Sequence, residues 1–364
     1  MKKKIAIDCR EFYKGKTTGI GRFLQNYISR LPALRPGWEF LLLGDSGTEL
    51  PFGLPGNVSF LAISGSNTQF WEQVSLPAAL KREKCDLFFS PYYKTCVFTG
   101  VPTIITIHDL TNLVYPGYTK FAAVYRGAMR FYAASAAAVL TVSEYSKQDI
   151  VRLLGVDPGK IFVNHNAVDP AVFYERGDAA PRLKKLGISA PYVLYVGNAN
   201  PHKNVDGLVK AFAELPERLR SGRSLVLAGV GDYAAPAGVG PGTLVKLERV
   251  PSEDLPFLYS AAEVFAFPSF YEGFGLPPVE AMACGAPVVS SNASSLSEVL
   301  GEACSYFDPA SVESMKNALA ALLSDKGVRD NLRLKGLEQA KKYDPLAAAE
   351  ALLPLFEACF RGVS

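Results

Sequence analysis

The sequence has little of what marks metal sites, disulfide scaffolds and membrane proteins. It contains 3 histidines and 6 cysteines among 364 residues, and no two cysteines form a Cys-x-x-Cys pair. Most of the cysteines stand inside apolar stretches, where a reduced thiol behaves as a small hydrophobic side chain. We therefore expect a reducing compartment, no structural zinc or other metal, and no bound cofactor.

An excess of charge of one sign is also missing. Lysine and arginine number 38 and aspartate and glutamate 35, which leaves a net charge of +3. Proteins that bind nucleic acid usually concentrate more cations on one face, so nucleic acid is not an expected partner. No apolar run is long enough to span a bilayer, and Ile5-Ala6-Ile7 meets Asp8 before it could form the apolar core of a secretion signal. These absences predict a cytoplasmic protein.

Short apolar runs of strand length alternate with longer segments of helical period, which is typical of parallel sheets with helices on both faces. A chain of 364 residues exceeds what one hydrophobic core usually supports, so we expect two domains. The predicted strands of the first domain are Lys4–Asp8, Phe40–Leu43, Val58–Leu61, Asp86–Phe89, Thr103–Ile107, Ala138–Val142 and Ile161–Val163. Those of the second are Tyr192–Gly197, Ser224–Gly229, Val245–Leu247, Val264–Phe267 and Pro287–Ser290.

The boundary between the domains is predicted where the periodicity fails and proline and glycine accumulate. We expect an N-terminal domain over 1–170, a linker over 171–190, a C-terminal domain over 191–345, and a last helix over 346–364 that packs back on the N-terminal domain. The predicted fold class is α/β, with two Rossmann-like, doubly wound parallel-sheet domains facing across a cleft.

The most informative segment is 268–285, which reads Pro-Ser-Phe-Tyr-Glu-Gly-Phe-Gly-Leu-Pro-Pro-Val-Glu-Ala-Met-Ala-Cys-Gly. It follows an apolar strand and ends with a glycine at a helix stop. Pro277 and Pro278 are tolerated only at a helix start, which predicts that Glu280 falls in the first helical turn and Glu272 in the preceding loop. The alternative needs no ligand: Glu280 caps its own helix, and Glu272 is a solvated loop residue.

Glycines in this loop let the backbone approach a ligand closely, and the positive end of the helix suits a diphosphate. Because carboxylates repel phosphate, Glu272 and Glu280 more plausibly accept hydrogen bonds from sugar and ribose hydroxyls. A pair of catalytic glycosidase carboxylates is the other reading, and the helix start and glycine loop argue against it.

Segment 268–285 resembles the donor-site motif of family 4 retaining glycosyltransferases, whose two Rossmann-like domains form the arrangement called GT-B. The resemblance implies that the N-terminal domain is the acceptor side and the C-terminal domain binds the nucleotide sugar. It implies that Glu272 contacts hydroxyls of the transferred sugar and that Glu280 binds the ribose. The loop and helix start between them would line the donor site with Gly273, Phe274, Gly275 and Leu276.

A second segment, Val196 to Asn204, leaves the first strand of the C-terminal domain and resembles the diphosphate-binding lysine segment of this family. Lys203 can meet phosphate as a point charge. Asn198 stands where many relatives have an arginine, so Lys203 has less cationic help here. An exposed lysine would be disfavoured near a helix start, which argues for a ligand role.

Two sites in the N-terminal domain complete the predicted set. Gly19, Gly21 and Arg22 follow the first strand, and in relatives this loop borders the diphosphate and the acceptor; a simple turn with a solvated arginine is equally compatible. The third residue of a dinucleotide fingerprint is replaced by Leu24, which disfavours an NAD site.

His108 beside Asp109 ends a strongly apolar strand, where open α/β sheets place ligand-binding residues. The family often has a histidine near the donor sugar at this position. A lone histidine is in general more often structural than catalytic, so a structural role is the alternative for His108. The predicted catalytic residues are therefore His108, Glu272 and Lys203.

The implied reaction transfers a hexosyl group from a nucleotide diphosphate sugar to a hydroxyl of a glycan or lipid-linked acceptor, with retention. The motif resembles mannosyltransferases that use GDP-mannose, and UDP-glucose donors occur in close relatives. No Asp-x-Asp pair is present to hold a metal on the diphosphate. A non-catalytic nucleotide-sugar-binding protein and an NAD-dependent oxidoreductase are the alternatives.

Surface polysaccharide and glycolipid synthesis are the processes that the resemblance implies. An acceptor of that kind is located at the inner face of the membrane, so a peripheral contact of the protein with that face is part of the expectation. The aromatic and basic stretch Tyr118–Tyr132 is compatible with a peripheral contact there, although a buried amphipathic helix is the favoured interpretation.

Overall fold

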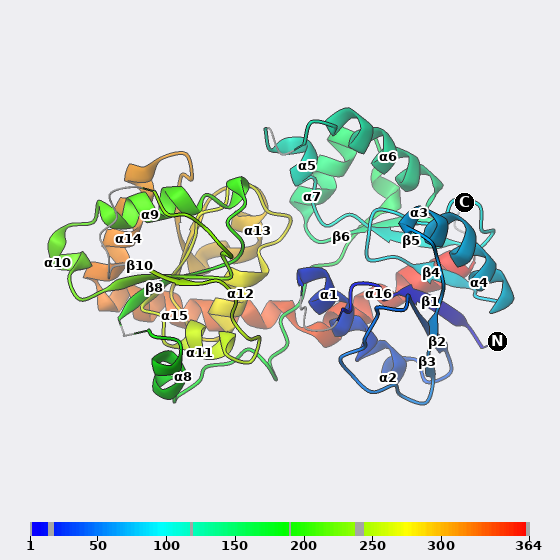
Figure 1. The fold of residues 1–364 in the computed structure, drawn as a ribbon, viewed down its shortest axis with the longest axis horizontal. Coiled ribbons are helices and arrows are strands. Elements are labelled where there is room, and N and C mark those ends of the chain that lie inside the picture. Colours follow the sequence, from blue (N-terminus) through cyan, green and yellow to red (C-terminus); the bar gives the residue numbers. More distant parts are fainter. Residues whose placement is uncertain (1, 14–17, 117–118, 189–190, 237–243, 362–364) are drawn as a thin grey trace. The chain divides into compact units, whose positions relative to one another are not determined.

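A computed structural model of the chain describes residues 2–13, 18–116, 119–188, 191–236 and 244–361. The chain divides into two compact units (Figure 1). Unit 1 consists of Met1–Ala167 and Pro345–Ser364, and unit 2 consists of Val168–Asp344.

Unit 1 is built on a seven-stranded sheet with the order β3-β2-β1-β4-β5-β6-β7 among the described residues. Each neighbouring pair is parallel, with registers such as Ile5 opposite Phe40 and Leu87. The central strands are buried on both faces, as apolar runs without alternation predict. The strands are β1 (Lys4–Asp8), β2 (Glu39–Gly44), β3 (Val58–Ala62), β4 (Leu87–Phe89), β5 (Thr103–Thr106), β6 (Ala138–Thr141) and β7 (Ile161–Val163).

Two apolar clusters of buried side chains pack unit 1. One joins Leu41, Trp71 and Phe88 with helix α4, and the other joins Ile105 and Met129 with the strands and helices near β6. The helices are α1 (Gly19–Ile28), α2 (Leu31–Leu34), α3 (Thr68–Phe70), α4 (Leu76–Arg82), α5 (Thr111–Val114), α6 (Ala122–Ser135), α7 (Glu144–Asp149) and α16 (Pro345–Phe360). Two π-helical segments, η1 (Trp71–Ser75) and η2 (Ile150–Leu154), and one 3-10 turn, η3 (Pro158–Lys160), complete the unit's described helical elements.

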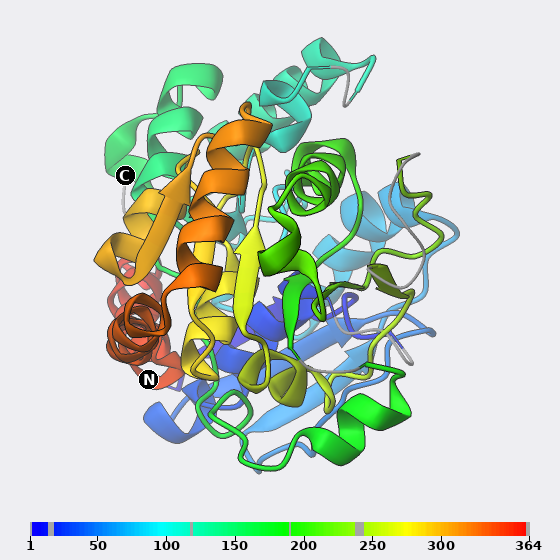
Figure 2. The same ribbon diagram turned by 90° about the vertical axis from the view of Figure 1, so that its left-hand side faces the viewer.

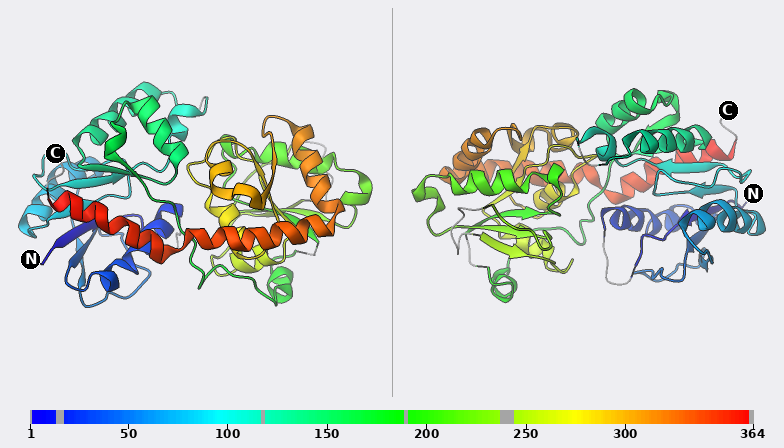
Figure 3. Two further views of the ribbon diagram at one scale, coloured as in Figure 1. Left: turned by 180° about the vertical axis from the view of Figure 1, so that it is seen from behind. Right: turned by 45° about the horizontal axis from the view of Figure 1, so that its top comes forward.

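Helix α16 belongs to unit 1 although it is the last element of the chain. It packs against α1, α2 and β4, and Figure 3 shows it in red alongside the first elements of the sequence. The helix starts at Pro345, where proline needs no hydrogen-bonding partner. Asn164, just after β7, fastens it by donating from its Nδ2 to the Ala348 carbonyl at 2.8 Å in a buried setting.

Unit 2 repeats the architecture with a six-stranded parallel sheet in the order β10-β9-β8-β11-β12-β13 among its described residues. Figures 1 and 2 show α9 and α14 on one face of this sheet and α11, α12 and α15 on the other. The strands are β8 (Tyr192–Val196), β9 (Ser224–Ala228), β10 (Leu244–Leu247), β11 (Val264–Phe267), β12 (Val288–Ser291) and β13 (Cys304–Phe307).

The helices of unit 2 are α8 (Ala180–Lys185), α9 (Val205–Ala213), α10 (Glu217–Arg220), α11 (Leu255–Ser260), α12 (Leu276–Ala283), α13 (Leu296–Leu300), α14 (Val312–Ser324) and α15 (Lys326–Ala340). Its shorter turns are η4 (Pro201–Lys203), η5 (Gly301–Ala303) and η6 (Lys341–Tyr343).

The predicted fold class, with two parallel-sheet α/β domains, is confirmed. One strand was not expected from the sequence: β13 is short and only its two end residues are buried, so its apolar signal is weak. The predicted linker 171–190 holds α8, and its described residues lie within unit 2.

Two further features concern the cysteines and the helices. The 6 cysteines are unpaired thiols with buried side chains. None of the helices formed by the described residues is long and apolar enough to cross a membrane.

We predict that Asn164→Ala destabilises unit 1 by about 1 kcal/mol, because the buried carbonyl of Ala348 loses a donor. Chemical denaturation monitored by circular dichroism measures this loss. Asn317→Ala is the control, since the exposed Asn317 donates to Glu313 on its own helix and its removal should change stability far less. Equal effects in the two variants would contradict a fastening role for Asn164.

Candidate functional site

In each unit the candidate residues lie near the carboxyl ends of parallel strands, although His108 follows β5 rather than a strand at the point where the strand order reverses. The reversal occurs between β1 and β4 in unit 1 and between β8 and β11 in unit 2. Chain segments leave the two strands of such a pair toward opposite faces of the sheet, which opens a crevice that ligands occupy in open α/β folds. The lysine segment follows β8, and the Glu272 loop follows β11.

Lys203 and Glu272 form an ion pair between the segments that follow β8 and β11. The Lys203 Nζ lies 2.6 Å from the Glu272 Oε1, and the two side chains are only 16% and 12% exposed. The same Nζ lies 5.7 Å from the ring centroid of Phe267, the last residue of β11. Partial burial strengthens this contact relative to a surface pair, so each charge holds the other in place.

Hydrogen bonds between the two loops keep them in register. The Nδ2 of Asn204 donates to the carbonyls of Pro268 and Pro309 at 3.2 and 2.8 Å, and the Phe270 amide donates to the His202 carbonyl at 2.8 Å. Asn204 adopts the left-handed conformation, with φ of 55°, which asparagine tolerates better than most residues. The loops that hold Lys203 and Glu272 are therefore fastened together independently of the ion pair.

The backbone of Glu272 is held on both sides by serines that follow β12. Its amide donates to the Oγ of Ser294 at 2.9 Å, and its carbonyl accepts from the Oγ of Ser295 at 3.0 Å. Ser295 is fully buried, and Ser294 has a positive φ of 53°, an unusual conformation for serine. These two contacts fix the backbone position from which the Glu272 side chain extends.

The glycine loop meets its helix at a position that only glycine can occupy. Gly275 has φ of 94° and precedes α12, and an added Cβ would lie 2.6 Å from the Leu296 Cδ2. Gly273, Phe274 and Gly275 are buried, whereas Leu276 is partly exposed.

Glu280 lies just beyond the first turn of α12, in which it was predicted. The helix begins at Leu276, with prolines in its first turn and no acidic residue there, so Glu280 is the fifth helical residue. The sequence-based placement in the first turn was wrong because the helix begins before the two prolines. Glu280 is 1% exposed, and its Oε2 accepts from the hydroxyl of Tyr259 at 2.9 Å in a buried contact.

Asn198 is exposed, and its side-chain oxygen accepts from the Asn200 amide at 3.1 Å. Its carbonyl accepts from the Tyr195 hydroxyl at 2.6 Å. Burial, together with the nearby charge of Glu272, raises the pKa of Tyr195 well above its ordinary value. Tyr195 thus stays a neutral donor that shapes the loop.

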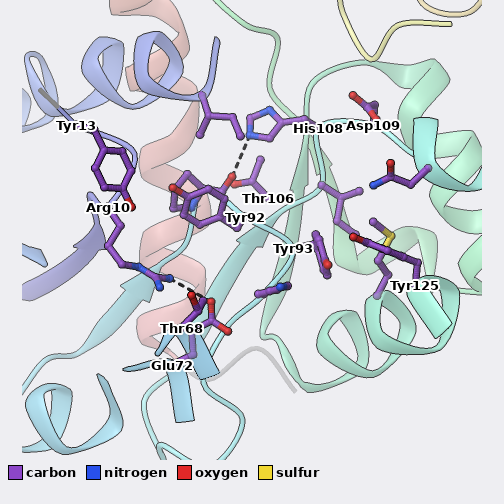
Figure 4. A pocket seen from close by; sticks show the side chains of 16 residues that line it. Arg10, Tyr13, Thr68, Glu72, Tyr92, Tyr93, Thr106, His108, Asp109 and Tyr125 are labelled. Atoms are coloured by element: carbon purple, nitrogen blue, oxygen red, sulfur yellow. Dashed lines mark hydrogen bonds and ion pairs between the residues drawn. The ribbon is translucent and has the colours of Figure 1, made fainter. Parts of the chain in front are cut away.

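Unit 1 has a pocket of its own at the β1 and β4 strand ends, with a volume of about 500 Å³ (Figure 4). Figure 4 shows Arg10 and Glu72 at one end, His108 and Tyr125 toward the other, and Tyr92 between them. The side chains that line the pocket combine aromatic rings with hydrogen-bonding groups. Such a lining suits a polyhydroxylated ring better than a purely apolar ligand.

A buried charge network forms one wall of this pocket. Arg10 makes contacts of 2.7 Å with Asp8 and 3.2 Å with Glu72, and its guanidinium lies 3.7 Å from the ring centroid of Trp71. Burial opposes the charged form, but the hydrogen bonds and charges of both carboxylates raise the pKa of Arg10 above its ordinary value. With one guanidinium against two carboxylates, the network carries a formal charge of −1 at this wall of the pocket.

His108 lies in the same pocket and is held as a neutral ring. Its Nε2 is 3.0 Å from the Pro91 carbonyl, which can only accept, so the proton sits on Nε2 and Nδ1 is the acceptor. Burial lowers the pKa of His108 below its usual value, and the Pro91 carbonyl and the charges of Asp109 and Glu11 oppose this only partly.

The loop before α1 is arranged as a helix cap. Thr18 accepts from the Gly21 amide at 3.0 Å and donates to Glu11, whose other oxygen accepts from the Tyr92 hydroxyl at 2.7 Å. Gly19 is exposed, and Gly21 is buried. Arg22 is partly exposed on the first turn of α1. The adjoining Thr17 lies outside the described residues.

Comparison with known proteins covers both units. A family model described as Glycosyltransferase Family 4 matches residues 17–172, and one described as Glycosyl transferases group 1 matches residues 183–342. The chain belongs to glycosyltransferase family 4.

Two relatives are mannosyltransferases from Escherichia coli. The O-antigen chain mannosyltransferase B is 36% identical over 252 residues, which cover 66% of each chain. The Serotype-specific mannosyltransferase WbdA is 28% identical over 257 residues, which cover 66% of this chain but only 31% of that protein.

Solved structures share the fold of this family 4 member over nearly its whole length. Sucrose-phosphate synthase from Thermosynechococcus elongatus has a TM-score of 0.79 at 19% identity and covers 99% of this chain and 100% of its own. Anabaena Alr3699/HepE in complex with UDP and glucose has a TM-score of 0.75 at 18% identity, covering 98% and 100%. The GT-B prediction is therefore confirmed, and membership of the family argues against the oxidoreductase alternative.

The predicted site residues of this glycosyltransferase separate into two groups. Lys203 and Glu272 meet directly, and Glu280 and the glycine loop belong to the same unit. His108 and the Gly19 to Arg22 segment lie in unit 1. Sequence reasoning missed Tyr259, Ser294 and Ser295, which support the two carboxylates, as well as the Arg10 network. For the Arg10 network the sequence offers one signal, which is that Asp8-Cys9-Arg10 places charged residues at the end of an apolar strand.

We predict that His108 makes this protein less stable as the pH falls below about 6.5, the ordinary histidine pKa. Because the folded-state pKa is lowered, the unfolded chain takes up a proton there that the folded chain does not. His108→Gln keeps a donor for Pro91 but cannot titrate. The difference in unfolding free energy between wild type and variant should be constant above pH 7. In acid the wild type should lose more stability than the variant does. A difference that is independent of pH would contradict a neutral, buried His108.

Proposed function

We propose that this chain transfers a hexosyl group from a nucleotide diphosphate sugar to a hydroxyl of a glycan or lipid-linked acceptor, with retention, during surface polysaccharide or glycolipid synthesis. GDP-mannose is the first donor to test, because relatives at 36% and 28% identity are named as mannosyltransferases. A UDP-sugar is the second, since a neighbour of the same fold is described in complex with UDP and glucose.

The observation that carries the proposal is the Lys203 and Glu272 pair at the strand ends of unit 2. Departure of a nucleoside diphosphate builds negative charge on its phosphates, and a fixed ammonium group stabilises that charge. In the proposed complex Lys203 exchanges part of its contact with Glu272 for phosphate oxygens. Glu272 is then available to accept from hydroxyls of the sugar.

Glu280 is proposed to accept from the ribose hydroxyls. Its buried carboxylate is oriented by the Tyr259 hydroxyl, so little freedom is lost when a second donor arrives. The glycine loop, with Gly273, Phe274, Gly275 and Leu276, lies between the two carboxylates in the sequence and would line the donor, with Asn198 on the neighbouring loop. The Gly19, Gly21 and Arg22 segment is proposed as a further donor contact from unit 1.

The acceptor is proposed to bind in the unit 1 pocket. Tyr92 and Tyr93 offer ring faces to a sugar, and burial raises the pKa of Tyr93 to about 12, which keeps it a donor. The neutral His108 offers an acceptor nitrogen for a hydroxyl. We further propose a cytoplasmic location with peripheral contact at the inner face of the membrane, consistent with buried, unpaired cysteines.

The proposal is tested by a transfer assay on the purified full chain. GDP-mannose, GDP-glucose and UDP-glucose are each incubated with a short water-soluble mannoside, and products are detected by mass spectrometry and their anomeric configuration by NMR. We expect an α-linked product from an α-linked donor. Tight donor binding with no transfer to any of a panel of mono- and disaccharide acceptors would favour a non-catalytic binding protein instead.

We predict different defects for the two charged residues of the donor site. Glu280→Ala should raise the dissociation constant of the nucleotide about tenfold, because a charged acceptor is lost. Lys203→Ala should lower kcat about 100-fold with a smaller effect on binding, because its charge acts mainly on the leaving group. Calorimetry and initial rates separate the two. Lys210→Ala, on the exposed face of α9, is the control, and unchanged binding and turnover in both site variants would refute the assignment.

We predict that Tyr259→Phe weakens nucleotide binding by about fivefold, since Glu280 loses a buried donor. Tyr192→Phe is a matched control. Tyr192 is equally buried and donates from its hydroxyl to the Leu258 carbonyl, away from the Glu280 side chain. Both variants should lose similar stability in a thermal melt. A loss of nucleotide affinity that is equal in both would show a general packing effect rather than orientation of Glu280.

A further inference from the structure

One carboxylate in the wall of the unit 1 pocket has an oxygen that no described residue satisfies. Glu72 lines the pocket and is 5% exposed. Its Oε1 accepts from the Nη2 of Arg10 at 3.2 Å, and among the described residues no donor reaches its Oε2. A buried carboxylate oxygen without a hydrogen bond is costly. Its place at the pocket wall therefore favours a molecule in the pocket that donates to it.

The backbone around Glu72 is fixed by packing. Glu72 belongs to the π-helical segment η1, and π-helical turns are frequent at functional sites. The preceding residue, Trp71, donates from its Nε1 to the Ile63 carbonyl at 3.2 Å in a buried contact. Gly65 packs against the same tryptophan, and an added Cβ there would lie 2.8 Å from the Trp71 Cβ. These contacts hold the turn that presents Glu72 to the pocket.

Arg10 does not neutralise Glu72, because Asp8 already pairs with this guanidinium. The Nε of Arg10 donates to the Asp8 Oδ1 at 3.0 Å, and its Nη2 donates to the Asp8 Oδ2 at 2.7 Å. Asp8 is 1% exposed and makes both contacts in a buried position. The contact with Glu72 is additional to this two-point pair, so Glu72 carries the surplus negative charge of the network.

The remaining charges of the pocket do not reverse this sign. Asp109 also lines it, and its Oδ1 accepts from the Thr111 amide at 2.8 Å. Glu11 lies behind the Tyr92 hydroxyl that donates to it. Lys94 is the opposing cation, but its side chain is exposed, and solvent screens its charge. The buried part of the pocket therefore favours ligands that donate hydrogen bonds over ligands that carry negative charge.

The wall that faces helix α6 offers rings instead of charges. Tyr125 and Met129 of α6 line the pocket, and the rings of Tyr93 and Tyr125 have centroids 6.5 Å apart. Figure 4 shows Tyr93 and Tyr125 on the side away from Glu72. The favoured interpretation of Tyr118–Tyr132, a buried amphipathic helix, holds for this face of α6 only, and Tyr118 lies outside the described residues. A ligand between the two walls would meet ring faces on one side and an acceptor oxygen on the other.

We propose that Glu72 determines the specificity of this pocket for a neutral sugar as acceptor. Its Oε2 accepts from a sugar hydroxyl, and its charge excludes acceptors that carry a carboxylate or phosphate group. An acidic sugar would bring a second negative charge against a carboxylate with little access to solvent, which is unfavourable. This inference rests on the proposed function, which places the acceptor in the unit 1 pocket, and names the chemical class of that acceptor.

The test compares acceptors in the transfer assay on the full chain, with methyl α-mannoside, its monodeoxy analogues and the corresponding methyl mannosiduronate. Glu72→Gln keeps an oxygen for Arg10 but puts an amide where Oε2 stands. It should raise the KM for the neutral acceptor about tenfold and leave the KM for the donor unchanged, because one charged acceptor group is lost. One deoxy analogue should cost wild type about tenfold in kcat/KM and cost the variant little, since the contact is already missing there.

Charge exclusion is measured as the ratio of kcat/KM for the neutral sugar to that for the uronate. Glu72→Gln should lower this ratio at least roughly tenfold, because the repelling charge is removed. Glu72→Asp keeps the charge and withdraws the oxygen by one methylene, so it should keep the exclusion of the uronate and lose the sensitivity to the deoxy analogue. A purely structural role for Glu72 would not separate these two readouts.

Glu83→Gln is the matched control in the same unit. Glu83 also pairs with a cation, Lys4, at 3.3 Å, but it does not line the pocket. Its removal should leave the KM and the uronate ratio as in wild type, and thermal melts check that each variant is folded. An unchanged acceptor KM in Glu72→Gln, or use of the uronate by wild type as readily as the neutral sugar, would overturn the inference and leave the enzyme proposal standing.

Binding without a donor separates the two proposals if no transfer occurs. Saturation-transfer NMR measures the binding of methyl α-mannoside and of the uronate to the full chain alone. A wild type that transfers to no acceptor counts against the enzyme proposal. In that case, binding of the neutral sugar that Glu72→Gln weakens would still support the specificity inference. Absence of binding to wild type, or equal binding to both proteins, would refute it.

Discussion

The parallel direction of β8, β11 and β12 is the constraint on which the proposed donor site of unit 2 depends. Because the strands run the same way, the segments that leave them emerge at one edge of the sheet, although they are far apart in sequence. Lys203, Glu272 and the serines after β12 come from three such segments. The strand order reverses between β8 and β11, and the Lys203 and Glu272 side chains join the two segments that leave these strands.

The ion pair gives this edge two properties that a nucleotide sugar needs. It keeps a carboxylate and an ammonium group ordered and partly desolvated, so neither must be arranged when the ligand binds. It also balances the local charge, since an unpaired Lys203 or Glu272 with so little exposure would be costly. In the proposed complex a diphosphate would bring the opposite charge to Lys203 and hydroxyls would bring donors to Glu272, so the ligand would replace the pair without leaving either group uncompensated.

Much of the fold could be predicted because its signal is local. Apolar runs such as Phe40–Leu43 and Val264–Phe267 are buried on both faces and bounded by polar turns, which identifies them without any tertiary information. β13 was missed because an edge strand with polar middle residues has no such run. Glu280 was placed within the first turn although it lies just beyond it, because proline is compatible with several positions of the first turn and does not fix where that turn begins.

The candidate site was harder, because its supporting contacts join distant parts of the chain. A resemblance of motifs singled out Lys203 and Glu272, but nothing in the sequence shows that Ser294 and Ser295 hold the Glu272 backbone or that Tyr259 contacts Glu280. The Arg10 network likewise joins residues 62 positions apart. Such contacts follow from the register of the sheets and the paths of the loops.

The central claim is that unit 2 binds a nucleoside diphosphate sugar at the ends of β8 and β11. Thermal melting of the full chain against GDP-mannose, GDP, UDP-glucose, UDP and NAD tests it most directly, because a ligand that binds only the folded state raises the melting temperature. The account predicts a rise with at least one nucleotide sugar and with its nucleoside diphosphate. Stabilisation by NAD alone, or by none of the five, would contradict it.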